Sequence, residues 1–102
     1  MSKMNKFMLF FNQVIKTLPL TLEINYTPVW GWWVRIIVAG RENENKYPKS
    51  RRLVVGSPLV ADATDKDMEV CFTKAHTELR EWIVNNVSYT DDIAKFMEIG
   101  GG

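Results

Sequence analysis

The fold is decided by residues 20 to 39, which read LTLEINYTPVWGWWVRIIVA. Apolar and polar residues alternate from Leu20 to Thr27, which is the pattern of a strand with one buried face and one face in water. Residues 27 to 31 supply turn residues, and a second alternating stretch runs from about Trp32 to Ala39. The short connection between the two stretches predicts an antiparallel hairpin.

The alternation gives the predicted hairpin two distinct faces. If Trp32 points to the core, Trp33 lies on the opposite, open face beside Arg35 and Ile37. A rigid aromatic side chain next to an arginine is the composition of a binding hot spot, although Trp33 could instead pack beneath a long loop or the C-terminal segment. The residues assigned to the buried face are Leu20, Leu22, Ile24, Tyr26, Trp32, Val34, Ile36 and Val38.

A helix is predicted before the hairpin, over residues 3 to 17. Phe7, Phe10 and Val14 widen its apolar stripe well beyond one face. Such a helix is either deeply buried or offers a second apolar face to a partner. Pro19 ends it, because the proline ring cannot continue a helix. The stripe itself, at helical spacing, consists of Met4, Met8, Phe11, Ile15 and Leu18.

A third strand is predicted after a polar loop. Leu53 to about Gly56 is apolar enough to form it, and Pro58 either ends the strand or places it at a sheet edge. Residues 59 to 61 would extend this strand beyond a bulge. The connection from the hairpin is then the loop from Arg41 to Arg52.

Two further helices follow the predicted third strand. Thr64 is the expected cap of a helix from residue 65 to about 86, with Asp67 as the acidic partner of a capping box. A short last helix is predicted over residues 90 to 97, before the terminal glycines. The apolar stripe of the long helix consists of Met68, Phe72, Ala75, Leu79 and Trp82.

This order of elements predicts the fold class α+β. Strands with one apolar face need a cover on that face only, and two long helices supply it. We expect one domain spanning residues 1–102, a two-layer sandwich of α-β-β-β-α order with a three-stranded antiparallel sheet, the helices on one face and a short C-terminal helix. The order resembles the double-stranded-RNA-binding domain fold over about residues 3 to 86. That family places a lysine cluster where this chain has Asp65-Lys66-Asp67-Met68-Glu69, which argues against duplex RNA binding.

The composition and the single cysteine limit the classes of protein to which the chain can belong. Hydrophobic residues make up 46% of the 102 residues, which is enough apolar surface to fold without covalent cross-links. Cys71 has no second cysteine for an intramolecular disulfide, and a lone thiol fits a reducing compartment. No stretch approaches the roughly 18 apolar residues of a membrane span. We therefore expect a cytoplasmic protein with no membrane partner.

The residues that carry chemistry do not form a recognisable catalytic or metal-binding set. Cys71 and the only histidine, His76, are five residues apart, which on a helix leaves their side chains about 140° apart. The acidic residues Asp62, Asp65, Asp67 and Glu69 do not match a calcium loop and are favoured at a helix start by its dipole. We expect no enzyme activity, no cofactor and no metal.

The charges of the chain are divided between its two parts. Residues 1 to 59 carry nine Lys/Arg and three Asp/Glu, a net charge of +6, and residues 60 to 102 carry four and nine, a net charge of −5. The loop from residue 41 to 52, called here the basic loop, has a net charge of +3. Such asymmetry is typical of a nucleic-acid surface, of self-complementary contacts between copies, or of a solvated loop.

Two hypotheses of function follow. The first is a small non-enzymatic binding module that acts by protein–protein contact, as an adaptor, an inhibitor or a self-associating subunit; phage and mobile-element regulators have this size. The alternative is a single-stranded nucleic-acid-binding protein that stacks a base on Trp33 and tracks phosphates with Arg35 and the basic loop. The candidate partner-binding residues are Trp30, Trp33, Arg35, Arg41, Lys46, Lys49, Arg51 and Arg52.

Overall fold

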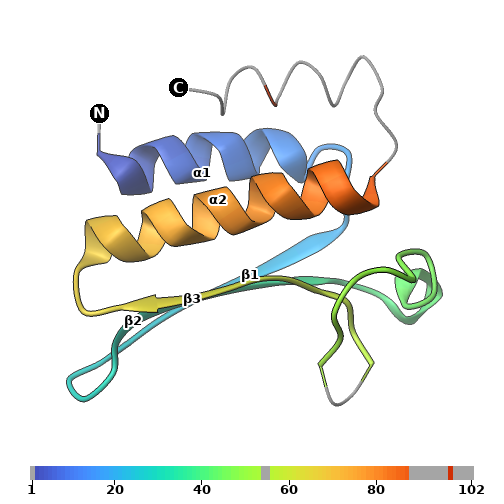
Figure 1. Ribbon diagram of the computed structural model, residues 1–102. Helices are drawn as coiled ribbons and strands as arrows, with labels where there is room; N and C mark the ends of the chain where they lie inside the picture. Colours follow the sequence, from blue (N-terminus) through green and yellow to red (C-terminus); the bar gives the residue numbers. More distant parts are fainter. Residues whose placement is uncertain (1, 54–55, 88–96, 98–102) are drawn as a thin grey trace.

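Three antiparallel strands lie against two helices in the computed structural model of the chain (Figure 1). The structure describes residues 2–53, 56–87 and 97. Helices and strands follow one another in the predicted order, so the α+β class and the α-β-β-β-α order are confirmed. Their bounds are α1 Lys3–Val14, β1 Leu20–Thr27, β2 Gly31–Val38, the short 3-10 helix η1 Arg41–Asn43, β3 Leu59–Asp65 and α2 Met68–Asn86.

The strands form one sheet in the order β1-β2-β3, so β2 is central and the other two strands are edges. The predicted β1–β2 hairpin is confirmed, with Tyr26 opposite Trp32 and Glu23 opposite Arg35. On its other side β2 pairs antiparallel with β3, and a register shift falls between Ile36 and Ile37. The two faces of β2 are those that the alternation predicts, because Val34, Ile36 and Val38 are buried.

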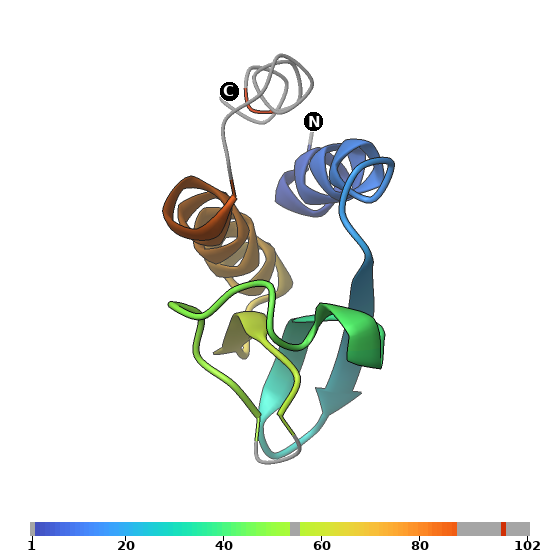
Figure 2. The same cartoon turned by 90° about the vertical axis from the view of Figure 1, so that its right-hand side faces the viewer.

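Both helices cover the same face of the sheet and leave the other face open (Figure 2). α2 packs on β2 and β3, and α1 packs beside α2. The core is rich in aromatic rings, among which Phe7 of α1 and Phe72 of α2 have centroids 5.4 Å apart. The wide apolar stripe of α1 is therefore explained largely by burial, of Phe7, Phe10, Phe11 and Val14. Among the helices described, none is long and apolar enough to cross a membrane.

The third strand lies further along the chain than predicted. The prediction of Leu53 to about Gly56 is wrong at its two described ends, because Leu53 and Gly56 lie in no strand and the Gly56 N–H donates to the Leu53 carbonyl (2.9 Å). Residues 54 and 55 lie outside the described residues. The predicted extension over residues 59 to 61 does lie in the observed strand. The strand is β3, Leu59–Asp65. Its buried residues are Leu59, Val60, Ala61 and Ala63, and the two small alanines make the alternation weak in hydrophobicity over residues 61 to 64.

α2 begins later than the sequence indicates, because β3 takes the residues before it. Thr64 was the expected cap, but it belongs to β3 and pairs with Trp33. The N-cap is Asp67, whose carboxylate accepts a hydrogen bond from the Val70 N–H (3.0 Å). The short helix predicted over residues 90 to 97 lies outside the described residues, apart from Met97.

β1 is less buried than its alternation indicates. All four apolar side chains of this strand were expected in the core, and Leu20 and Leu22 are indeed partly buried against it. Ile24 and Tyr26, however, keep 42% and 57% of their surface exposed. The reason is topological: β1 is an edge strand, and α1, which lies on its side of the sheet, packs mainly on α2 (Figure 2).

Candidate functional site

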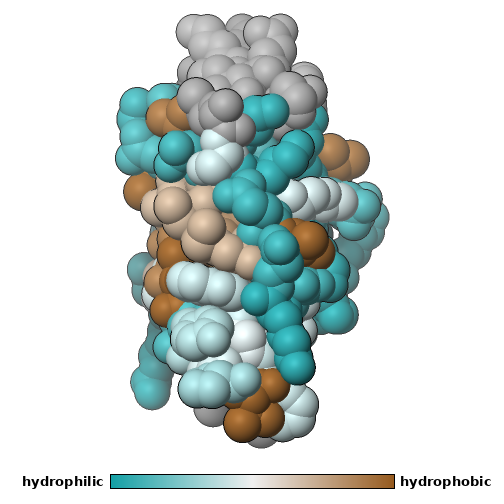
Figure 3. All heavy atoms as spheres, turned by 90° about the vertical axis from the view of Figure 1, so that its left-hand side faces the viewer, coloured by the Kyte–Doolittle hydropathy of each residue, from teal (hydrophilic) through white to brown (hydrophobic). Residues whose placement is uncertain are grey.

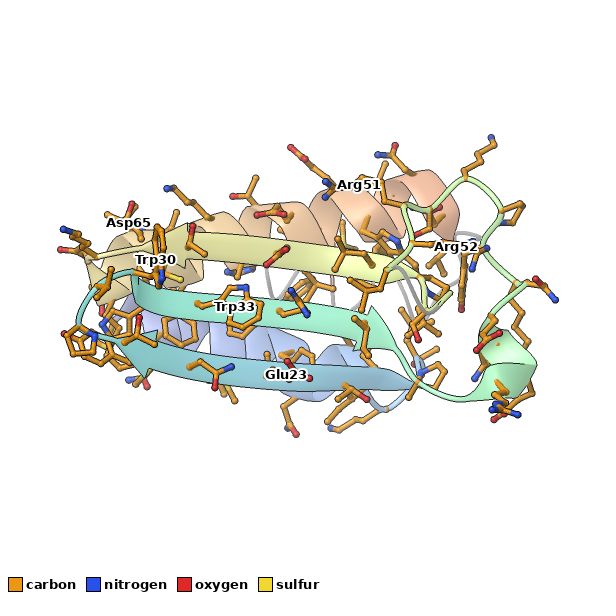
Figure 4. All side chains as sticks on the ribbon, turned by 90° about the horizontal axis from the view of Figure 1, so that it is seen from below. Glu23, Trp30, Trp33, Arg51, Arg52 and Asp65 are labelled. Atoms are coloured by element: carbon orange, nitrogen blue, oxygen red, sulfur yellow. The ribbon has the colours of Figure 1, made fainter. Side chains whose placement is uncertain are left out.

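The open face of the sheet carries two rows of side chains that run across all three strands. One row consists of Glu23, Arg35 and Asp62, which the strand register places opposite one another. The neighbouring row, closer to the hairpin turn, consists of Asn25, Trp33 and Thr64. Trp33 therefore lies on the open face beside Arg35, as predicted, at the middle of the sheet (Figure 4).

Trp33 is held in place by its neighbours on this face. Its indole Nε1–H donates to Asp62 Oδ1 at 2.5 Å, and the Arg35 guanidinium carbon lies 4.3 Å from the centroid of its ring. Arg35 Nη2 is in turn 3.9 Å from Asp62 Oδ2. The three side chains thus fix one another, so the exposed part of the indole is presented without further loss of side-chain freedom.

Next to Trp33 the face is hollowed. Trp30, from the hairpin turn, forms the other aromatic wall and is 75% exposed. Its backbone N–H donates to Thr27 Oγ1 (3.1 Å), which fixes the turn. The hollow has a volume of about 350 Å³ and two indole rings supply its apolar walls; we call it the aromatic hollow. Its lining consists of Asn25, Thr27, Trp30, Gly31, Trp33 and Thr64.

Gly31 forms the floor of the aromatic hollow, and no other residue fits there. Its φ of +82° is a conformation that favours glycine. A Cβ at this position would lie 2.6 Å from Lys66 Cα and 2.8 Å from the Asp65 carbonyl oxygen. The glycine therefore allows the end of β3 to pass directly behind the hairpin turn.

The basic loop lies away from the aromatic hollow. It follows β2 and begins with Arg41 in η1, whereas the hollow lies at the hairpin end of the sheet. Figure 4 shows Arg51 and Arg52 at the opposite end of the sheet from Trp30. The structure therefore brings Trp30, Trp33 and Arg35 together, and separates them from Arg41, Lys46, Lys49, Arg51 and Arg52.

Arg52 has a structural role inside its own loop. Its Nη1 donates to the carbonyls of Glu44 and Gly56, and its Nη2 donates to the carbonyl of Tyr47 (3.1 Å). Two of these carbonyls belong to the basic loop and the third, of Gly56, follows it, so one guanidinium ties the loop to the segment that leads into β3. Three of the five N–H groups of this guanidinium are therefore used inside the fold, which leaves fewer of them for a phosphate.

The basic loop is also anchored to α2. The Trp82 indole N–H donates to Ser50 Oγ (2.8 Å), and the Tyr47 ring packs at 4.9 Å from the Trp82 ring. A second hollow of about 460 Å³ lies between the loop, β3 and α2. It mixes both signs of charge, because Lys49 and Arg51 share its lining with the α2 carboxylates Glu78 and Glu81.

Cys71 and His76 serve packing. Cys71 is completely buried, and burial raises the pKa of its thiol, which makes it a poor nucleophile. His76 is a boundary residue that stacks on Phe10 with ring centroids 4.8 Å apart. Both positions agree with the prediction of a small core cysteine and a boundary histidine. Within residues 2–53, 56–87 and 97, no group of three or more His, Cys, Asp or Glu side chains is placed to hold a metal ion.

Sequence reasoning missed the importance of Asp62. It was grouped with the acidic residues of a helix start, but it lies in β3 on the open face, where it accepts from Trp33. Asp65 ends the same strand, and the Asp67 N–H and the Lys74 ammonium lower the pKa of its carboxyl group. The signal that could have placed Asp62 is the alternation of Ala61, Asp62, Ala63 and Thr64.

Comparison of the chain with protein-family models, with curated proteins and with solved structures finds no match in any of the three.

Proposed function

We propose that the chain is a small non-enzymatic binding module that acts by protein–protein contact through the open face of its sheet. The observation that carries this proposal is the aromatic hollow, in which Trp30 is 75% exposed and Trp33 is fixed by Asp62 and Arg35. Exposed tryptophan beside arginine, already ordered before binding, is the composition and the condition of an interface hot spot.

The chemistry of the surface indicates the kind of segment that would bind. The walls of the aromatic hollow are indole rings, which favour a large apolar side chain of a partner. The adjoining row has two carboxylates, of Glu23 and Asp62, against the single guanidinium of Arg35. We therefore infer a protein segment in which a large apolar residue is flanked by Lys or Arg.

Selection of peptides from a random display library against the full chain tests this proposal. We expect enrichment of an apolar residue next to a basic one, and a loss of affinity of at least about 30-fold on Trp33→Ala, since truncating a hot spot costs about 2 kcal/mol or more. Val84→Ala, which removes an exposed apolar side chain of α2, is the matched control and should leave affinity unchanged. Binders that tolerate both Trp30→Ala and Trp33→Ala would refute the proposal.

The alternative of single-stranded nucleic-acid binding stays a prediction that the geometry does not favour. It requires one path from a stacking ring to a row of cations. Here Arg35 is paired with Asp62, Arg52 is bonded to carbonyls of its own loop, and Lys49 and Arg51 face carboxylates of α2. Oligonucleotide binding at low salt that weakens on both Trp33→Ala and Lys49→Ala would revive it.

A further inference from the structure

The two edge strands, β1 and β3, differ in whether side chains bond to their outward backbone groups. At the β3 edge, the backbone groups that point outward are capped by α2: the Asp62 N–H donates to Glu78 Oε1 (3.1 Å), and the Thr64 carbonyl accepts from Lys74 Nζ (3.2 Å). Charged side chains that occupy an edge in this way prevent another strand from pairing with it. The β3 edge is therefore closed to strand addition over this part of its length.

The hydrogen-bond pattern between β1 and β2 shows which backbone N–H and C=O groups of β1 point away from the sheet. The Ala39 N–H donates to the Pro19 carbonyl (2.8 Å), and these residues continue the β1–β2 register. Hydrogen-bonded pairs alternate with non-hydrogen-bonded pairs along an antiparallel ladder. Since Pro19 and Ala39 form a hydrogen-bonded pair, the odd-numbered residues of β1 are the ones that bond to β2. The outward N–H and C=O groups are then those of Leu20, Leu22, Ile24 and Tyr26.

In the part of the chain that the structure describes, no side chain or proline blocks the β1 edge against another strand. Among the described residues, no side chain caps the outward groups of Leu22, Ile24 or Tyr26. The strand is eight residues long and contains no proline and no lysine. Its one charged side chain, Glu23, points to the open face, opposite Arg35. A long uncapped edge strand is a template for pairing with another strand.

The apolar surface extends from this edge onto α1. Phe10 faces α2, where it stacks on His76. Met8 and Ile15 lie about 140 to 160° round the helix from Phe10, on the flank turned away from α2, and both are exposed. Figure 3, which views the hairpin end, shows tan and brown side chains gathered over the helix layer. Ile24 and Tyr26 of β1 are exposed as well, so β1 and this flank of α1 both present apolar side chains.

We propose that the β1 edge is a homodimer interface, in which two copies pair their β1 strands antiparallel and join their three-stranded sheets into one sheet of six strands. The second copy fits because β1 is self-complementary about Ile24. With Ile24 opposite Ile24 of the second copy, Leu22 faces Tyr26 and Glu23 faces Asn25. Moving the register by two residues in one direction places Glu23 opposite Glu23, and like charges directly opposite each other are unfavourable. Moving it in the other direction shortens the paired stretch from residues 21–27 to residues 23–27. The helix flanks that carry Met8 and Ile15 then meet above the paired strands.

The mass of the full chain in solution tests this proposal. We expect twice the mass of one chain by light scattering and sedimentation, and the mass of a single chain for Ile24→Lys and for Ile24→Glu, because each places like charges at the two-fold axis. A mixture of the two variants should restore the dimer. Ile24 is partly exposed, so both variants should keep the circular dichroism of the parent. Val84→Lys, on exposed α2 surface, is the matched control and should remain dimeric.

A cross-linking variant reports the register without relying on charge. Directly paired residues of an antiparallel ladder have Cα atoms about 5.5 Å apart, within disulfide range. Ile24→Cys should therefore form a covalent dimer in oxidised glutathione, which takes up the two electrons and two protons of the thiols. The exposed Val29→Cys should not, and buried Cys71 does not compete. A single-chain mass at every concentration, or equal cross-linking of the two variants, would overturn the proposal.

The proposed homodimer and the proposed peptide binding can be tested independently, because they use different residues. Trp33 lies on the open face of the central strand, so Trp33→Ala should abolish peptide binding and leave the dimer intact. Ile24 points to the helix layer at the edge, so Ile24→Lys should dissociate the dimer and leave peptide binding to the aromatic hollow unchanged.

Discussion

The hairpin end and the loop end of the sheet use the same kinds of residue in opposite ways. At the loop end, Arg52 is bonded to three carbonyls and the indole of Trp82 to Ser50, so both side chains hold the fold together. At the hairpin end, Trp30 is exposed and Trp33 is fixed with part of its ring facing solvent. Residue type alone does not separate a structural arginine or tryptophan from one that is available to a partner; the surrounding hydrogen bonds do.

The largest effect is expected at the floor of the aromatic hollow. Gly31→Ala should lower the free energy of unfolding by about 3 kcal/mol, because the new Cβ combines a strained φ with a collision against the backbone of β3. Gly56→Ala at the loop end is the control: its φ is also positive, but the nearest atom is 3.9 Å away, so it should cost only about 1 kcal/mol. Urea denaturation of both variants measures the difference, and equal losses would contradict it.

Arg52 provides the next largest effect. Arg52→Ala should lower the free energy of unfolding by about 1.5 kcal/mol, because the carbonyls of Glu44, Tyr47 and Gly56 lose their shared donor. The neighbouring Arg51→Ala should stay within about 0.5 kcal/mol of the parent, as surface substitutions usually do. Chemical denaturation distinguishes the two, and hydrogen exchange of the loop should quicken only in the first. Two indistinguishable variants would mean that Arg52 does not tie the loop.

Trp30 should behave as a functional rather than a structural residue. Its side chain is 75% exposed, so Trp30→Ala should change the free energy of unfolding by less than about 0.5 kcal/mol. Trp82→Ala, the comparison variant, removes a buried indole and its bond to Ser50, and should cost about 3 kcal/mol, the same as Gly31→Ala. Thermal melting of the two variants compares the ends of the sheet directly. A large loss of stability in Trp30→Ala would place that ring in the fold, and not in a binding surface.

The smallest effect is an acid-dependent one at the start of α2. The Asp67 N–H and Lys74 lower the pKa of Asp65 from its ordinary 3.8, so the folded state favours the charged carboxylate. This contribution to stability is present above pH 3.8 and is lost as the pH falls through the folded-state pKa. Asp65→Asn should reduce the difference in stability between neutral and acidic solution. An unchanged pH dependence would show that the interaction does not stabilise the fold.

Sequence reasoning was most reliable where hydrophobic alternation is strong. The β1–β2 hairpin, the faces of β2 and the order of elements are confirmed. Apolar and polar residues alternate over the eight positions of β1, and a short turn joins this strand to the strongly apolar β2. The prediction placed β3 too early in the chain because the alternating part of the strand, residues 61 to 64, has only Ala61 and Ala63 on its buried face, and alanines carry little hydrophobic weight. The apolar Leu53 was the stronger local signal, but it lies in no strand of the sheet.

The candidate site was predictable only in its aromatic part. Period-two alternation placed Trp33 and Arg35 together on the open face, which the register confirms. Asp62, the acceptor for Trp33, comes from a strand that was misplaced, so the contact between them was invisible in the sequence. The basic loop was grouped with Trp33 and Arg35 because a sequence shows which residues are charged, but not where those charges lie in the folded chain. Its separation from Trp33 depends on how the loop returns to β3 and on carbonyl groups that composition does not show.

The most direct test of the proposed binding surface uses the four tryptophan indoles as reporters. Titration of the ¹⁵N-labelled full chain with a peptide selected against it should shift the indole N–H signals of Trp30 and Trp33, which flank the aromatic hollow. The indole signal of Trp82, bonded to Ser50 at the loop end, should stay in place. Shifts confined to Trp82 and the basic loop, with Trp30 and Trp33 unchanged, would contradict the assignment of the open sheet face as the binding surface.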